Sequence, residues 1–254
     1  MLKLGWMSTG RGQGSFELFR VVCENVEAGK LNARISCVVT NRGRGEAEQS
    51  DRFLDLVRSK GLPLVSESSS RFKKDFTGQD WRTAFDRLLS SRIEQFDVDL
   101  FFLAGYMLIV SDFFCNRYVL LNLHPALPDG PTGTWQEVMQ ELARTQAART
   151  GAMIHVVTPQ LDRGPLASYF SFPLTGEPFD DLRQSGDTDA LAAAIRKQEL
   201  RREFPLILTT LRSLTAGDIV ISGRRVCDRA GRLLDHGKDL TADIERLLQF
   251  EGRG

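Results

Sequence analysis

The sequence is poor in the residues that build metal sites and disulfide frameworks. It has three histidines and four cysteines, and Cys23, Cys37, Cys115 and Cys227 form no C-x-x-C pair. Because structural zinc sites gather Cys and His at short, regular spacings, we expect no metal site. Scattered cysteines are typical of reduced thiols, so we expect a cytoplasmic protein.

An excess of charge and a long apolar run are also lacking. Lys+Arg and Asp+Glu both number 33, which gives a formal net charge of zero. Without a basic block, we expect no nucleic acid and no membrane surface as a partner. The longest apolar run, residues 100–110, is about half of the roughly 20 residues that a transmembrane helix needs. Residues 1–12 contain no apolar core of signal-peptide length.

The first half of the chain alternates between two patterns. Runs rich in apolar or β-branched residues predict strands, and amphipathic stretches predict helices. The expected strands are residues 2–8, 33–40, 62–65, 98–104 and 118–122, and the main helices are residues 15–28, 46–60 and 81–96. This order predicts an α/β fold: a mostly parallel twisted sheet with helices on both faces and a Rossmann-type N-terminal half. Residues 66–77 are expected to be irregular.

The second half changes character. We expect a helix at 136–147, strands at 152–157 and 167–172, a long helical stretch at 188–214, a hairpin turning at Ser222-Gly223 and a helix at 241–250. Pro205 is expected to kink or divide the long helical stretch. No linker separates the halves. We therefore predict one domain over residues 1–225, with residues 226–254 as a C-terminal extension packed on it.

A glycine-rich turn follows the first predicted strand. It reads Gly10-Arg11-Gly12-Gln13-Gly14-Ser15 and opens a helix, with Ser15 as the expected N-cap. Backbone N–H groups at a helix N-terminus favour a phosphate or similar anion, although a tight turn without a ligand remains the alternative. A dinucleotide is disfavoured because Ser15 replaces the third glycine and the second strand ends in Thr40-Asn41 without an acid.

Asn122 and His124 lie at the end of the last strand of the first half. Residues two apart on an extended chain share a face, so both side chains should reach the ligand-binding edge of the sheet. There Asn can donate to a developing oxyanion, and His can do the same or move a proton. Asp162, in the link between the next two strands, is either a turn residue or a partner of His124. His155, inside an apolar strand, is expected to be structural.

Four motifs together resemble the folate-dependent formyltransferase family. They are the glycine loop at 8–16, LAGYMLIV at 103–110, NLHPALP at 122–128 and the G-x-[ST]-[VI]-H…D-x-G-P signature at 151–165. The resemblance runs from about residue 1 to about residue 225. It departs at Phe16, where the family has Asn, at Leu108, where it has Arg, and at Met153, where it has Ser or Thr. Residues 129–135 and 198–205 also differ from the family pattern.

The resemblance implies a reaction and a set of site residues. A formyl group would pass from 10-formyltetrahydrofolate, a co-substrate, to the primary amine of glycinamide ribonucleotide in purine biosynthesis, in a monomer or homodimer that needs no metal. The implied catalytic residues are Asn122, His124 and Asp162. The implied folate-binding residues are Arg82, Met107, Leu108, Ile109, Val110, Asn122 and Thr158. The implied phosphate-binding residues are Gly12, Gly14 and Ser15.

Three other hypotheses stay open from the sequence. One is a formyltransferase that acts on a different amine, because most departures fall on the amine side. Another is a noncatalytic relative that binds folate or a nucleotide. The third is a dehydrogenase-like α/β protein, which Thr40 and Asn41 disfavour.

Overall fold

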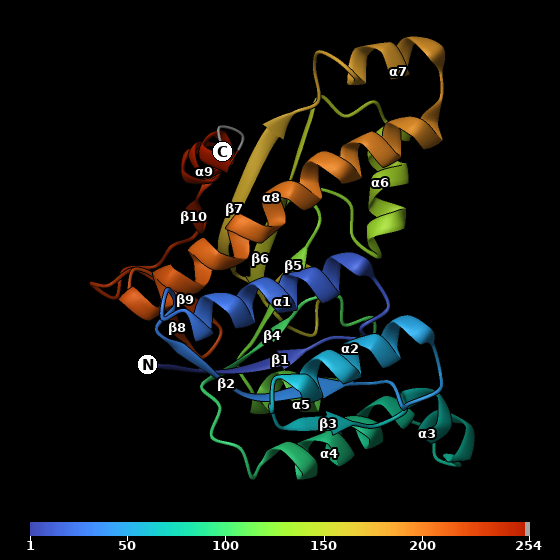
Figure 1. The fold of residues 1–254 in the computed structure, drawn as a ribbon, viewed down its shortest axis with the longest axis vertical. Coiled ribbons are helices and arrows are strands. Elements are labelled where there is room, and N and C mark those ends of the chain that lie inside the picture. Colours follow the sequence, from blue (N-terminus) through green and yellow to red (C-terminus); the bar gives the residue numbers. More distant parts are fainter. Residues whose placement is uncertain (252–254) are drawn as a thin grey trace. The chain divides into compact units, whose positions relative to one another are not determined.

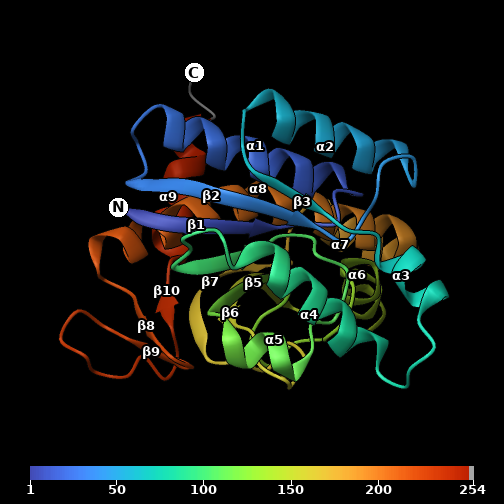
Figure 2. The ribbon, with the colours of Figure 1, turned by 90° about the horizontal axis from the view of Figure 1, so that it is seen from below.

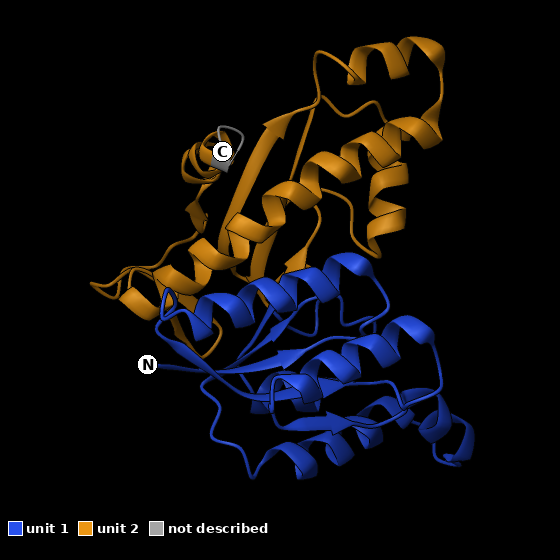
Figure 3. Ribbon diagram, in the orientation of Figure 1, with its two compact units in different colours: residues 1–122, 157–160 blue, residues 123–156, 161–254 orange. Residues whose placement is uncertain are grey.

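The computed structural model describes residues 1–251 and divides into two compact units (Figures 1 and 3). Unit 1 holds residues 1–122 and 157–160, and unit 2 holds residues 123–156 and the chain from residue 161 onward. This division runs through a strand and does not coincide with the boundary expected after residue 225, which stays a prediction. No helix among the described residues is both long enough and apolar enough to cross a bilayer.

Unit 1 is built on parallel strands. In the order in which they pair, these are β5 (Leu120–His124), β4 (Leu100–Leu103), β1 (Leu2–Met7), β2 (Ala33–Thr40) and β3 (Leu64–Ser66). β4 is buried along its whole length, as its unbroken apolar sequence predicts. The mostly parallel sheet expected from the sequence is confirmed.

Helices cover both faces of the strands of unit 1 (Figure 2). They are α1 (Gln13–Glu27), α2 (Glu48–Ser59), α3 (Ser69–Asp75), α4 (Trp81–Ile93) and α5 (Asp112–Arg117). α1 and α2 lie on one face, and α4 and α5 lie on the other. The prediction of an irregular segment at 66–77 is wrong, because Ser68 caps α3 by accepting from the Arg71 N–H.

Unit 2 combines an antiparallel strand pair with a long helix. Its elements are α6 (Trp135–Arg144), β6 (Arg149–Val156), β7 (Leu166–Pro173), α7 (Phe179–Ser185), α8 (Thr188–Ala216), β8 (Val220–Ser222), β9 (Arg225–Cys227), β10 (Lys238–Asp239) and α9 (Thr241–Glu251). β6 pairs with β7, and their register shifts between Ile154 and His155. β8 and β9 form the expected hairpin, and β10 pairs with β7. The C-terminal segment thus pairs with a strand of the same unit.

The long helix α8 runs without a break through Pro205 and packs on β6, β7 and α6 (Figure 1). Of the two alternatives for Pro205, division of this stretch is therefore wrong, and a kink in the helix stays a prediction. A proline removes one backbone hydrogen bond and disturbs one turn, and burial of Leu206, Ile207 and Leu211 against the unit outweighs that loss.

A buried ion cluster lies on α8. The Arg196 guanidinium is 3.0 Å from Glu199 Oε2 and 2.5 Å from Glu203 Oε1. Both carboxyl groups are fully buried, and one cation faces two acids. Burial, reinforced by the negative charge of Glu203, raises the pKa of Glu199 well above its usual value near 4.5. Glu199 is therefore the acid of the cluster that retains its proton.

Glu199→Gln is expected to stabilise the protein increasingly as the pH rises. The raised pKa means that the folded chain keeps the Glu199 proton while the unfolded chain releases it above about pH 4.5. The wild type therefore loses stability with rising pH, and the neutral amide removes that loss. Urea unfolding of both proteins between about pH 5 and about pH 8 measures the difference. Glu203→Gln is the matched control, because it breaks the pair with Arg196 and should cost about 3 kcal/mol. Equal losses in both variants would contradict the assignment of the proton to Glu199.

Candidate active site

His124 ends β5, at the carboxyl edge where the sequence places it. The side chain is buried, and its Nε2 lies 2.8 Å from the carbonyl oxygen of Pro131. Since a carbonyl only accepts, Nε2 carries a hydrogen and donates it. In the neutral ring, Nδ1 is then the basic nitrogen.

Asp162 faces that basic nitrogen. Its Oδ2 lies 3.5 Å from His124 Nδ1 and also accepts from the Gly133 N–H at 3.2 Å. Asp162 is buried and has a φ of +52°, in the left-handed region that Asp and Asn enter more readily than other side chains. Such a conformation is held only where the surroundings fix it, and it often marks a functional site. The alternative that paired Asp162 with His124 agrees with this geometry.

His155 also faces Asp162, which the sequence analysis did not anticipate. Its Nε2 lies 3.7 Å from Asp162 Oδ1, and its Nδ1 lies 3.1 Å from the Val156 carbonyl oxygen. The register shift in β6 falls directly before His155. The signal for this second imidazole was its place in the 151–165 signature, because an apolar strand alone predicts only a core histidine.

Burial and charge set the protonation of the cluster. Burial lowers the pKa of His124, and the Asp162 carboxylate and the bond to Pro131 only partly offset it. Burial opposes ionisation of Asp162, but His155, His124 and the Gly133 N–H together hold the pKa of Asp162 below its usual range. Near neutral pH the pair is therefore a neutral imidazole beside a carboxylate. Such a pair can accept a proton at Nδ1 and stabilise the resulting imidazolium.

Asn122, the third predicted catalytic residue, precedes His124 by two residues in β5 and lies opposite Leu103 of β4. It is only partly buried. Its proposed role as an oxyanion donor stays a prediction.

The predicted phosphate-binding residues lie at the start of α1. The helix begins at Gln13 after Gly12, so Gly14 and Ser15 belong to its first turn. Ser15 is therefore not the N-cap; its hydroxyl donates to the Gly12 carbonyl at 2.8 Å. First-turn N–H groups have no partner within a helix, so this position is suited to an anion.

The predicted folate-binding loop follows β4. Gly105 has a φ of +67°, and a Cβ built on it would lie 2.8 Å from Ser15 Cβ, so this loop touches the start of α1. Met107 and Ile109 are about half exposed although their side chains are apolar. Thr158 bonds to the Gln160 carbonyl at 3.2 Å, and Arg82 lies over the Trp81 ring on α4. Folate binding by these residues remains a prediction.

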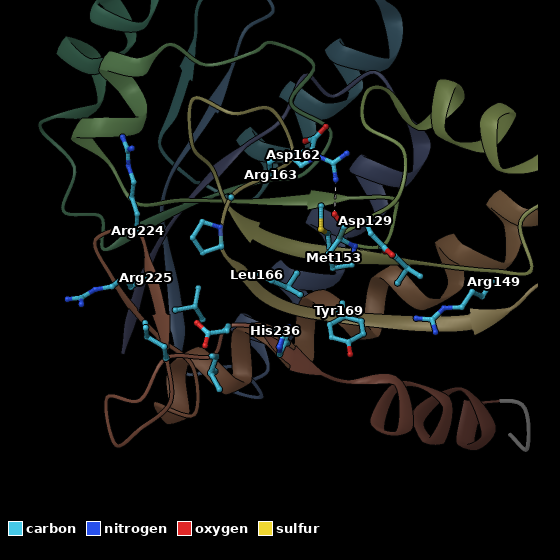
Figure 4. A pocket seen from close by; sticks show the side chains of 18 residues that line it. Asp129, Arg149, Met153, Asp162, Arg163, Leu166, Tyr169, Arg224, Arg225 and His236 are labelled. Carbon is cyan, nitrogen blue, oxygen red and sulfur yellow. Dashed lines mark hydrogen bonds between the residues drawn. The ribbon is translucent and has the colours of Figure 1, made fainter. Parts of the chain in front are cut away.

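Unit 2 also contains a cavity of about 720 Å³, and Asp162 is one of the residues that line it (Figure 4). Met153 lines it from β6 and Tyr169 from β7. Arg225 of β9 and His236, between β9 and β10, also line it. Its lining carries charges of both signs. It therefore favours no ligand of a single charge.

The chain is similar to known formyltransferases in sequence and in fold. Residues 11–176 match the model of the formyl transferase family. Over 198 residues the chain is 29% identical to phosphoribosylglycinamide formyltransferase of Escherichia coli strain K12, covering 74% of this chain and 84% of that protein. Glycinamide ribonucleotide transformylase 1 from Symbiobacterium toebii superposes with a TM-score of 0.68 at 26% identity, covering 92% and 95% of the two chains.

A phosphoribosylglycinamide formyltransferase from Coxiella burnetii is similar in fold, with a TM-score of 0.73, 20% identity and coverage of 94% and 98%. The family match spans more than half of the chain and contains Asn122, His124, His155 and Asp162. The chain therefore belongs to the formyl transferase family.

Proposed function

We propose that the chain is a formyltransferase that moves a formyl group from 10-formyltetrahydrofolate to the primary amine of glycinamide ribonucleotide, a step of purine biosynthesis in the cytoplasm. The observation that carries the proposal is the buried His124–Asp162 pair at the end of β5, with Asn122 two residues earlier in that strand. The names of the relatives in Escherichia coli and Symbiobacterium toebii support the substrate.

In this proposal three side chains assist the transfer of one formyl group. The amine attacks the formyl carbon, and Asn122 donates to the oxygen as it gains negative charge. His124 takes the amine proton at Nδ1, and Asp162 stabilises the imidazolium that forms. The carbonyl then re-forms as the bond from the formyl carbon to the folate nitrogen breaks, and that leaving nitrogen takes the proton, directly or through water. No step needs a covalent enzyme intermediate, so no cysteine or serine nucleophile is required.

The proposed folate site has the surface that a flat ring requires. Exposed Met107 and Ile109 offer apolar area in the loop that follows β4. Leu108, Val110, Thr158 and Asn122 would complete this site, and Arg82 would meet the acidic tail. The co-substrate supplies the formyl group, and these residues bind and orient it.

The amine is expected to carry a phosphate. Gly12, Gly14 and Ser15 would bind it at the start of α1. Phe16 and the sequence at 129–135 depart from the family on this side. These departures favour, as the second candidate, a formyltransferase that acts on a different amine. In either case we expect a monomer or a homodimer.

Turnover with a panel of amines tests the proposal. Purified protein with 10-formyltetrahydrofolate should formylate glycinamide ribonucleotide with a kcat/KM at least about tenfold higher than for glycinamide, which lacks the phosphate. Faster turnover of another amine would favour the second candidate. Folate binding without turnover on any amine would favour the noncatalytic relative and overturn the proposal.

A further inference from the structure

Thr9 joins the two loops at the carboxyl end of β1 and β4. It lies two residues after the end of β1 and is fully buried. Its N–H donates to the Gly105 carbonyl at 3.0 Å, and its own carbonyl accepts from the Ser50 hydroxyl of α2 at 3.1 Å. The backbone of Thr9 is therefore fixed from both sides.

The hydroxyl of Thr9 makes two further bonds. The Met107 N–H donates to Oγ1 at 2.8 Å, and Oγ1 donates to Asn41 Oδ1 at 2.8 Å. Asn41 Nδ2 lies 3.2 Å from Ser69 Oγ, which assigns the orientation of the amide. Because a hydroxyl has one hydrogen and Asn41 takes it, the lone pairs of Oγ1 are left for the Met107 N–H. All the polar groups of Thr9 are thus used.

These bonds connect the predicted phosphate-binding turn at the start of α1 to the predicted folate-binding loop after β4. Thr9 leads into Gly12 and α1, and Met107 begins the segment 107–110. Gly105 also lies close to Ser15, so the same two loops approach each other at a second point. Met107 itself is half exposed, so its side chain contributes little to fixing its backbone. The hydrogen bond to the Thr9 hydroxyl therefore fixes the backbone at the start of this segment.

We propose that Thr9 is a positioning residue that sets the backbone of residues 107–110 for the folate co-substrate. It touches no reacting atom and acts through the Met107 N–H. The inference rests on the proposed function, because it takes 107–110 as the folate loop. Loss of the hydroxyl should therefore weaken folate binding more than it slows the chemical step.

Thr9→Val is the decisive variant, because valine has almost the same shape and lacks the hydroxyl. Its KM for 10-formyltetrahydrofolate should rise about tenfold, and kcat should fall less than about threefold. Thr9→Ser keeps the hydroxyl and should restore the wild-type KM. Ser50→Ala is the matched control, because it removes the other buried hydroxyl bonded to Thr9 and should leave the KM unchanged. Hydrogen exchange of the Met107 amide should be faster in Thr9→Val and not in Thr9→Ser.

Each outcome decides the inference. An unchanged KM in Thr9→Val overturns it, as does an equal rise in Ser50→Ala. Should Thr9→Val not fold, Thr9→Ala with the same measurements takes its place. If the wild type binds 10-formyltetrahydrofolate by calorimetry but turns over no amine, the proposed function fails alone, and the dissociation constants of the variants then decide the role of Thr9. If the wild type does not bind 10-formyltetrahydrofolate, both proposals are overturned.

Discussion

His124→Ala is expected to lower turnover by about a hundredfold or more, because it removes the group that accepts the amine proton. The variant should still fold, since a small side chain fits the buried site and the losses are confined to the bond to the Pro131 carbonyl and the pairing with Asp162. Asn122→Ala should cause a drop of about the same size, because it removes an oxyanion donor. Steady-state kcat with saturating 10-formyltetrahydrofolate and amine measures both effects.

His236→Ala is the control for this prediction. His236 is exposed and lies between β9 and β10. Its replacement should leave kcat within about twofold of the wild type. Near-normal turnover in His124→Ala or Asn122→Ala would refute the catalytic assignment of that residue.

Asp162→Asn is expected to reduce kcat by about a hundredfold or more. The amide has the shape of the carboxylate and can still accept from the Gly133 N–H. It carries no charge, however, and no longer stabilises an imidazolium at His124. The loss should therefore appear in kcat and only weakly in either KM.

The same substitution should move the acid limb of the pH profile of kcat to lower pH. Asp162 raises the pKa of His124, whereas burial, His155 and Arg163 lower it. Without the carboxylate the pKa of His124 falls, so the ring stays neutral to a lower pH. Carbon-13 NMR of the imidazoles follows this directly. Asp129→Asn, an exposed acid near the same site, should shift nothing. A shift of the acid limb to higher pH in Asp162→Asn would contradict the pairing.

The sequence predicts the scaffold well where local and tertiary preferences agree. The expected strand at 33–40 is confirmed to the residue, because β-branched side chains fill it and Asn residues bound it. α3 and α7 were missed because each is only seven residues long and mostly polar, which is shorter than the window in which a helical repeat can be recognised. Division of the helix at Pro205 was predicted wrongly as an alternative, because packing within unit 2 outweighs one lost hydrogen bond.

Local sequence patterns predict only part of the candidate site. The spacing of Asn122 and His124 on one strand is visible in the sequence. The approach of Asp162 depends on a left-handed backbone and on Gly133, in a loop far along the chain. His155 was missed because its orientation follows from a register shift, which hydrophobic periodicity does not contain. The residues alone left Asp162 as either a turn residue or a partner of His124, and the resemblance to a family favoured the catalytic role.

The shifted register before His155 has a consequence for how the protein tolerates insertions and deletions. Successive side chains of a strand point to opposite faces, so removing one residue between 149 and 154 would turn the imidazole away from the carboxylate. Natural variants of this chain should therefore change in length in the surrounding loops and keep the length of β6 fixed.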